Sequence, residues 1–152
     1  MIRHFTASAV ILADDHVLLI EHKKAGGWLY PGGHLQPGED PARAVLREVQ
    51  EEVGIDIHLL AEHRFDHPAV GVIPTPFTIM DVPVRDSTFG HHHHIDFVYA
   101  ACPLSSAVTL RPEEVNGYQW VPVADVASLP TPAELPDLIA AAAEHIGTAQ
   151  LW

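Results

Sequence analysis

The stretch that decides the fold is Gly32 to Ile55, GGHLQPGEDPARAVLREVQEEVGI, which leads from a glycine pair into a helix and out again. Asp40 is a good helix N-cap and Pro41 suits the first helical position. Gly54 lies where a helix that ends in the left-handed conformation places a glycine. The sequence therefore predicts a helix between Asp40 and Gly54.

The apolar residues of this helix are expected to form one stripe. They recur at i, i+3, i+4, i+7 and i+11, and at about 100° per residue they fall in a single arc. The arc consists of Ala42, Val45, Leu46, Val49 and Val53. This spacing predicts that the stripe faces a hydrophobic core.

Beside the stripe lie three glutamates, Glu48, Glu51 and Glu52, within an arc of about 100°. We expect them to point across the entrance of a site rather than into the core. Like charges at these spacings repel by about 0.2–0.5 kcal/mol per pair. Hard cations such as Mg²⁺ or Mn²⁺ prefer oxygen ligands and would relieve that repulsion. The acidic face therefore predicts a Mg²⁺ site, with Mn²⁺ as a substitute, whereas the simplest alternative is an ordinary solvated helix face.

The rest of the chain predicts a mixed α/β (α+β) sandwich, built as a single domain over residues 1–152. Thr6–Ala13 and His16–His22 are expected to form a hairpin around Asp14–Asp15, and Pro31 to Gly33 to interrupt the strands. Further strands and a second helix are predicted at Trp28–Tyr30, Asp56–Leu60, Phe77–Val84, His93–Cys102, Tyr118–Val121 and Glu134–Ile146.

Composition limits the classes of partner. Hydrophobic residues make up 47% of the 152 residues and charged residues 18%, a balance typical of globular proteins. The formal net charge of -12 argues against binding to a nucleic-acid polymer or an anionic membrane. The lone cysteine, Cys102, has no internal disulfide partner, and we expect a cytoplasmic protein.

Between Gly33 and Ile55 the chain resembles the Nudix box, GX5EX7REUXEEXGU with U aliphatic, and every fixed position is filled. Gly33 is followed after five residues by Glu39, and after seven more by REVQEEVGI, which begins at Arg47. The resemblance extends to WLYPGGHLQPGE before the box and to YQWVPVADVASLP near the C-terminus. It implies a Nudix-type α/β/α sandwich around a mixed β-sheet.

The resemblance also implies an activity and roles for individual residues. The expected reaction is Mg²⁺-dependent hydrolysis of the pyrophosphate linkage in a nucleoside diphosphate derivative, such as an unmodified or oxidised dNTP or another NDP-X. Glu48, Glu51 and Glu52 would be metal ligands, together with the Gly33 carbonyl. Glu48 or Glu51 would accept the proton from water. Arg47 would orient the glutamates and Glu39 would support the loop.

The base stays open, because some family members place it outside the box; candidates here are Asp86, Asp96, Glu113 and Glu114. The partner is expected to be a small nucleotide or another diphosphate, and many relatives are homodimers. One alternative is a catalytically silent Nudix module that binds a nucleotide-like ligand as a sensor. Another, the isomerase branch, would need a reactive cysteine, for which Cys102 is a weak candidate.

Four consecutive histidines, His91 to His94, enter a predicted strand. Because side chains alternate along a strand, His92 and His94 share a face with Asp96, and His91 and His93 share the other. A zinc or nickel site is conceivable, but adjacent imidazoles that point oppositely are poor co-ligands. Polar lining of the cleft or ordinary surface is favoured, with His92 and His94 as substrate contacts.

Aromatic residues offer platforms for a nucleotide base, although packing in the core or a lid is the stronger expectation. Trp28 and Tyr30 are the proposed substrate contacts among them. The other candidates are Phe77, Phe89 and Tyr118.

Overall fold

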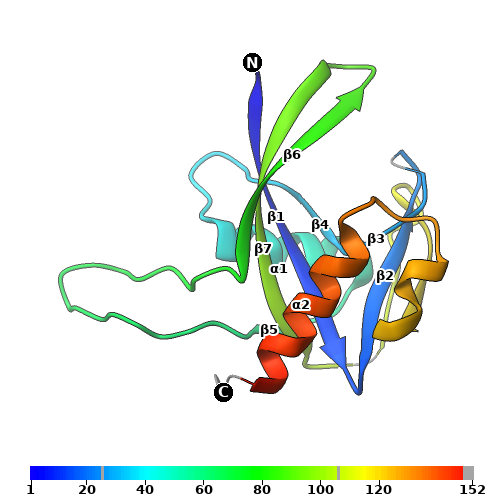
Figure 1. The fold of residues 1–152 in the computed structure, drawn as a ribbon. Helices are drawn as coiled ribbons and strands as arrows, with labels where there is room; N and C mark the ends of the chain where they lie inside the picture. Colours follow the sequence, from blue (N-terminus) through cyan, green and yellow to red (C-terminus); the bar gives the residue numbers. More distant parts are fainter. Residues whose placement is uncertain (25, 106, 149–152) are drawn as a thin grey trace.

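The computed structural model describes residues 1–24, 26–105 and 107–148 (Figure 1). Its strands are β1 (Arg3–Ala13), β2 (His16–His22), β3 (Trp28–Leu29), β4 (Gly32–His34), β5 (Ile57–Leu59), β6 (Thr78–Asp86), β7 (Gly90–Pro103) and β8 (Val115–Pro122). The helices are α1 (Pro41–Val53), the 3₁₀ helix η1 (Val123–Ser128) and α2 (Leu135–Thr148).

The sheet is mixed, as predicted, and β1 is its central strand. Strand β1 runs parallel to β7, while its N-terminal half pairs antiparallel with β4 and its C-terminal end with β2. Strand β7 is flanked by β5 and β6, and β2 by β3 and β8, all antiparallel. This topology places residues from β1, β4 and β7 side by side at one end of the sheet.

The helices cover opposite faces of the sheet, which confirms the predicted sandwich (Figure 1). Alternation along β1 divides its side chains between the two layers: Ala9 and Ile11 pack toward α1, whereas Val10 packs toward α2. On the α2 face the partners of Val10 include Val98 and Ile139. A sheet with both faces covered explains why β1 is apolar over most of its length.

Helix α1 has the predicted ends. The Asp40 carboxylate accepts a hydrogen bond from the Arg43 N–H at 2.9 Å, and Gly54 adopts the left-handed conformation with φ of 68°. Its buried face differs from the prediction in one respect, because Leu46 is 41% exposed while Ala44 and Glu52 are buried. At about 100° per residue, the buried arc is rotated away from Leu46 toward the glutamates. The core and the acidic face therefore overlap at Glu52.

Two other elements differ from the sequence prediction. The expected break at Pro31 to Gly33 contains strand β4, because glycine lets this segment lie against β1: a Cβ at Gly32 would stand 2.6 Å from the Ala7 carbonyl oxygen. The 3₁₀ helix η1 was not predicted. The turn at Asp14–Asp15 is present, with φ of 49° and 60°, which suits a tight hairpin.

The connection between β5 and β6 leaves the body of the sheet as a long loop (Figure 1). The loop is anchored near its C-terminal end, shortly before β6, where the Tyr99 hydroxyl donates to the Pro74 carbonyl oxygen at 2.9 Å. Among the described residues, no helix is both long enough and apolar enough to cross a membrane.

Candidate active site

A cleft of about 610 Å³ opens where α1 meets the sheet, and the box residues Gly33, Glu48 and Glu52 line it. Among the charged side chains of its wall, carboxylates outnumber cations. The other acidic residues are Asp86, Asp96, Glu113, Glu114 and Glu134, against the cationic side chains of Lys24 and Arg85. An anionic ligand would be repelled by such a wall unless cations accompanied it.

Gly33 and Glu48 are in direct contact across the cleft floor. A Cβ on Gly33 would stand within 3.0 Å of the Glu48 carboxylate. Glycine is therefore required here for close approach rather than for an unusual φ angle. Burial raises the pKa of Glu48, and the hydrogen bond from Arg47 opposes that shift.

Glu52 is the most buried of the three glutamates, with 1% of its surface exposed. Its Oε1 accepts the Gly32 N–H at 2.8 Å. Burial nevertheless raises the pKa of Glu52 to about 8, because one backbone hydrogen bond does not offset removal of the carboxylate from water. Glu52 therefore lines the cleft, as expected, but is much more buried than the expected position at an entrance, and it lies between core and cleft.

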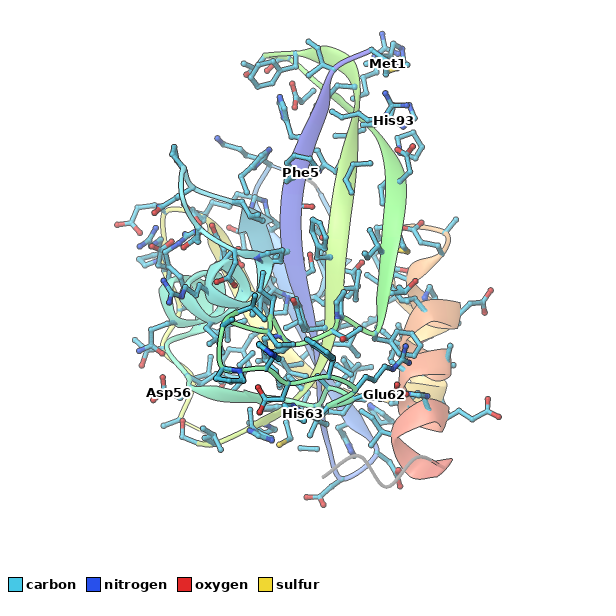
Figure 2. All side chains as sticks on the ribbon, turned by 90° about the vertical axis from the view of Figure 1, so that its left-hand side faces the viewer. Met1, Phe5, Asp56, Glu62, His63 and His93 are labelled. Atoms are coloured by element: carbon cyan, nitrogen blue, oxygen red, sulfur yellow. The ribbon has the colours of Figure 1, made fainter. Side chains whose placement is uncertain are left out.

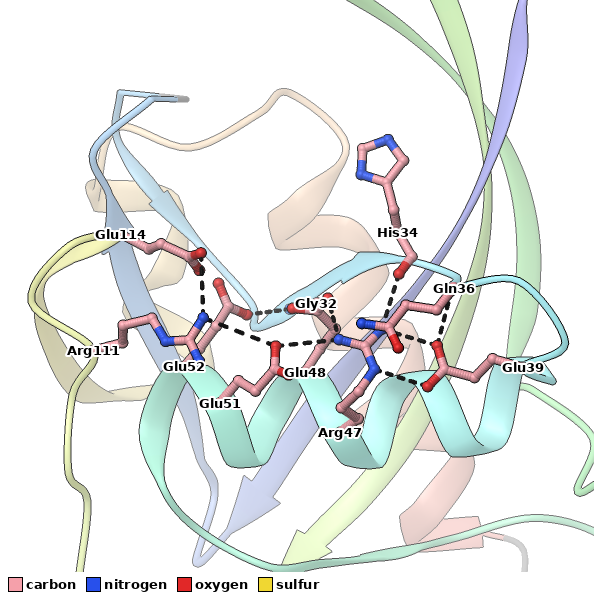
Figure 3. A network of polar contacts seen from close by, with 10 residues as sticks. All are labelled: Gly32, His34, Gln36, Glu39, Arg47, Glu48, Glu51, Glu52, Arg111 and Glu114. Carbon is pink, nitrogen blue, oxygen red and sulfur yellow. Dashed lines mark hydrogen bonds and ion pairs between the residues drawn. The ribbon is translucent and has the colours of Figure 1, made fainter.

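Arg47 holds the acidic side of the site together (Figure 3). Its guanidinium binds both carboxylate oxygens of Glu39, at 2.7 and 2.9 Å, in a bidentate pair. It also donates to Glu48 Oε1 at 2.9 Å, to Glu51 Oε2 at 3.1 Å and to the His34 carbonyl oxygen at 3.0 Å. One side chain thus fixes the loop before α1 relative to two of the glutamates.

Arg111 is a participant that sequence reasoning missed. Its guanidinium lies 4.0 Å from Glu51 Oε2 and 3.5 Å from Glu114 Oε1 (Figure 3). The backbone N–H of Arg111 also donates to the Glu52 carbonyl oxygen at 3.1 Å. Arg111 belongs to no sequence motif and lies in a loop almost sixty residues after the end of α1. Only the tertiary fold places it beside the glutamates.

Asp96 forms a second buried acidic centre, on β7. Its carboxylate accepts hydrogen bonds from the Thr6 hydroxyl at 2.9 Å and the Ser8 hydroxyl at 3.0 Å, both on β1. Burial raises the pKa of Asp96, and these hydroxyl donors act against the shift. Burial raises the pKa of Tyr30 as well, and the negative charge of Asp96 adds to it. The Thr6 and Ser8 partners carry no sequence signal of their own.

The remaining residues that the sequence proposes for the site differ in their position relative to the cleft. Tyr30 and His94 line the cleft, as do all four candidate bases outside the box. Trp28 packs against the α2-side core and His92 is 1% exposed, so the structure does not bring either to the cleft wall. Glu51 lies at the flank, in contact with Arg47 and Arg111.

The donor set fits a hard divalent cation. Glu48 and Glu52 present carboxylate oxygens to one cleft, and the contact between Gly33 and Glu48 leaves main-chain atoms of Gly33 beside them. Oxygen donors of this kind suit Mg²⁺ or Mn²⁺ rather than softer ions. The site therefore matches the cation that the acidic helix face predicts.

Comparisons with known proteins agree with the fold and the motif. The sequence profile of the NUDIX domain matches residues 2–142. The crystal structure of a NUDIX-family hydrolase from Clostridium perfringens superimposes with a TM-score of 0.79 and 27% identity, covering 96% of this chain and 99% of that one.

Two curated relatives are named for their substrates. The chain is 29% identical to the 8-oxo-dGDP phosphatase NUDT18 of Homo sapiens over 142 residues, or 89% of this chain and 36% of that protein. It is 36% identical to the 8-oxo-dGTP diphosphatase of Proteus vulgaris over 58 residues, or 36% of this chain and 52% of that protein. The chain thus spans about a third to a half of the length of these relatives.

The profile covers nearly the whole chain, and the intact box lies at the cleft where helix and sheet meet. The chain belongs to the Nudix hydrolase family.

Proposed function

We propose that this chain hydrolyses the pyrophosphate linkage of a nucleoside diphosphate derivative in a Mg²⁺-dependent reaction. The observation that carries the proposal is the convergence of Glu48, Glu52 and Gly33 on one cleft. The surrounding carboxylates would repel a diphosphate that carries no metal ion, and they would attract divalent cations.

Glu48, Glu51, Glu52 and the Gly33 carbonyl would hold Mg²⁺, with Mn²⁺ as a substitute. Bound there, the cation supplies polarisation of the phosphoryl oxygens and neutralisation of the leaving phosphate. Glu51 would reach the cation from the flank of the cleft, where its carboxylate pairs with Arg47 and Arg111.

The protein's own residues position the attacking water. Glu48 is favoured over Glu51 as the proton acceptor because it lines the cleft and because burial raises its pKa toward the working range of a general base. Arg47 keeps the Glu48 carboxylate in place through its hydrogen bond to Oε1, while Glu39 anchors Arg47 from the other side. Arg47 is thus a positioning residue.

The substrate class follows from the relatives and the wall of the cleft. The two relatives described above are named for 8-oxo-deoxyguanosine nucleotides, which makes oxidised dNTPs and dNDPs the first candidates. Tyr30 and His94, which line the cleft, are placed to contact the ligand.

A panel of nucleotides tests this proposal. The protein is incubated with Mg²⁺ and dNTPs, 8-oxo-dGTP, 8-oxo-dGDP, ADP-ribose or nucleotide sugars, and both products are identified by mass. We expect cleavage within the phosphate chain of at least one member. Melting-temperature shifts with a panel member but no product from any of them would instead identify a sensor module.

A further inference from the structure

The His91–His94 run does not act alone in the structure. Histidines from three adjacent strands meet at one end of the sheet: His4 on β1, His34 on β4, and His92 and His94 on β7. The parallel register of β1 and β7 sets His4 directly beside His94. Strand β4 carries His34 opposite Thr6, one step along the same face of β1.

The ring nitrogens of three of these residues are close enough to share one ion. Ligand atoms of His4, His92 and His94 all lie within 4.8 Å of one another. The Nε2 atoms of His92 and His94 are 3.1 Å apart. Two nitrogens bound tetrahedrally to one Zn²⁺ at 2.0–2.1 Å would be separated by about 3.3 Å, so this pair already has ligand spacing.

The surroundings orient the most buried ring. His92 is 1% exposed, and its Nδ1 lies 3.2 Å from the Gly90 carbonyl oxygen. A carbonyl that accepts the Nδ1 proton leaves Nε2 as a lone-pair donor, which is the arrangement that second-shell partners give metal-binding histidines. The Phe89 ring covers the cluster, with its centroid 4.6 Å from that of His4. The cluster therefore combines converging nitrogens with an oriented, sheltered ring.

A fourth ligand is available on either side. His34 Nε2 lies 3.3 Å from His4 Nδ1, and Asp86 Oδ2 lies 3.6 Å from His92 Nε2. Imidazole nitrogen suits Zn²⁺, Ni²⁺ and Cu²⁺, whereas Mg²⁺ prefers oxygen. The histidine cluster and the glutamate cluster thus differ in the ions they would select.

We propose that His4, His92 and His94 form a zinc-binding site whose ligands differ from those of the glutamate site, although His94 also lines the cleft that holds the glutamates. His34 or Asp86 completes it. The bound ion joins the N-terminal strand β1 to the β6–β7 hairpin, two segments that run side by side at this end of the sheet (Figure 1). This proposal does not depend on hydrolysis, because every contact that carries it lies among the histidines, Phe89, Gly90 and Asp86.

The four-histidine run contains its own control. His93 points to the other face of β7, where its Nδ1 lies 2.6 Å from Asp81 Oδ1. Figure 2 shows His93 at the same end of the sheet as Met1. His91 is exposed. A run that chelates like an affinity tag would need all four histidines, whereas the proposed site needs only His92 and His94 from the run.

Calorimetric titration with Zn²⁺ in excess Mg²⁺ tests the site. The parent should bind one Zn²⁺ with micromolar or tighter affinity and melt at a higher temperature with Zn²⁺. His4→Ala and His94→Ala, both at partly buried positions, should each weaken binding roughly tenfold or more and lose the melting shift. The His91→Ala/His93→Ala double variant should bind Zn²⁺ like the parent.

Three results would overturn the proposal. The first is no saturable Zn²⁺ binding by the parent. The second is binding that survives in His4→Ala and His94→Ala, which would place the ion elsewhere, for example at the glutamates. The third is an equal loss in the double variant, which would mean chelation by the run itself. Hydrolysis of a nucleotide plays no part in any of these readouts.

Discussion

The Glu48 carboxylate lies against the Cα of Gly33, so closely that a Cβ there would fall within 3.0 Å of it. This contact joins β4 to α1 at the point where both line the cleft. It explains in physical terms why the sequence motif begins with a glycine fifteen residues before its first helical glutamate.

Gly33→Ala should therefore displace Glu48 and lower kcat/KM at least about tenfold, while the unfolding free energy changes by less than about 1 kcal/mol. Stability changes little because the clashing group is the end of a side chain rather than backbone. Gly117→Ala on β8 is the matched control, since a Cβ there meets nothing within 4 Å. Equal activity of Gly33→Ala and Gly117→Ala would refute the role of this contact.

Substitution of the glutamates should separate activity from stability. Glu51→Gln and Glu52→Gln should each reduce turnover by orders of magnitude, because each removes a charged oxygen donor from the proposed metal site. Steady-state kinetics on the best substrate of the panel measures this. Activity within twofold of the parent for either variant would remove that residue from the metal site.

The two variants should differ in stability. Glu52→Gln should melt at an unchanged or higher temperature without metal, because Glu52 is buried and its charge is poorly compensated. Glu51→Gln loses its ion pair with Arg47 at a partly exposed position, which costs at most about 1 kcal/mol. A large drop in melting temperature for Glu52→Gln would show that its carboxylate stabilises the metal-free fold.

The raised pKa of Glu52 predicts a pH dependence of stability in EDTA. Its folded pKa is about 8 against an ordinary value of 4.5, so between these pH values the folded state holds a proton that the unfolded state has lost. The contribution of Glu52 to the unfolding free energy is fully present below pH 4.5 and is lost as pH rises toward 8.

Urea unfolding at several pH values should therefore show the parent losing stability relative to Glu52→Gln across this window. Glu62 lies outside the cleft wall. The difference in unfolding free energy between the parent and Glu62→Gln should therefore not follow the pH dependence expected for Glu52→Gln. A constant difference between parent and Glu52→Gln would contradict the raised pKa.

The end of α1 gives a prediction about stability alone. Gly54 has φ of 68°, and a Cβ there would stand 3.0 Å from the Thr109 carbonyl oxygen. Gly54→Val should destabilise the protein by about 1–3 kcal/mol, because a β-branched residue is strained in this conformation. Gly147→Ala in α2, where a Cβ meets open space, should leave stability unchanged or raise it. Denaturant unfolding compares the two, and equal stabilities would be inconsistent with the observed cap.

Local sequence rules predicted the elements that depend on neighbouring residues. The cap residues Asp40 and Gly54 act within one turn of the helix, and the hairpin at Asp14–Asp15 depends on two residues. The exposure of Leu46 could not be predicted in this way, because the rotation of α1 against the sheet is set by contacts with distant strands.

The residues of the site also divide into those that local sequence predicts and those that only the tertiary fold brings together. The box glutamates lie close together in sequence, and their spacing alone predicts that they share one side of the helix. Arg111, the Thr6–Ser8–Asp96 group and the approach of His4 to His94 all depend on strand register and loops. Alternation along β7 relates only the histidines of the run to one another, whereas His4 and His34 join them from two other strands.

Hydrolysis in ¹⁸O-labelled water most directly tests the central claim, that this cleft directs water to a phosphorus atom of a diphosphate. The best substrate of the panel is incubated with Mg²⁺, and the masses of both products are recorded. We expect one ¹⁸O atom in a phosphate group of one product, and no product in EDTA. Turnover that persists in EDTA, or products without ¹⁸O in a phosphate group, would contradict the account.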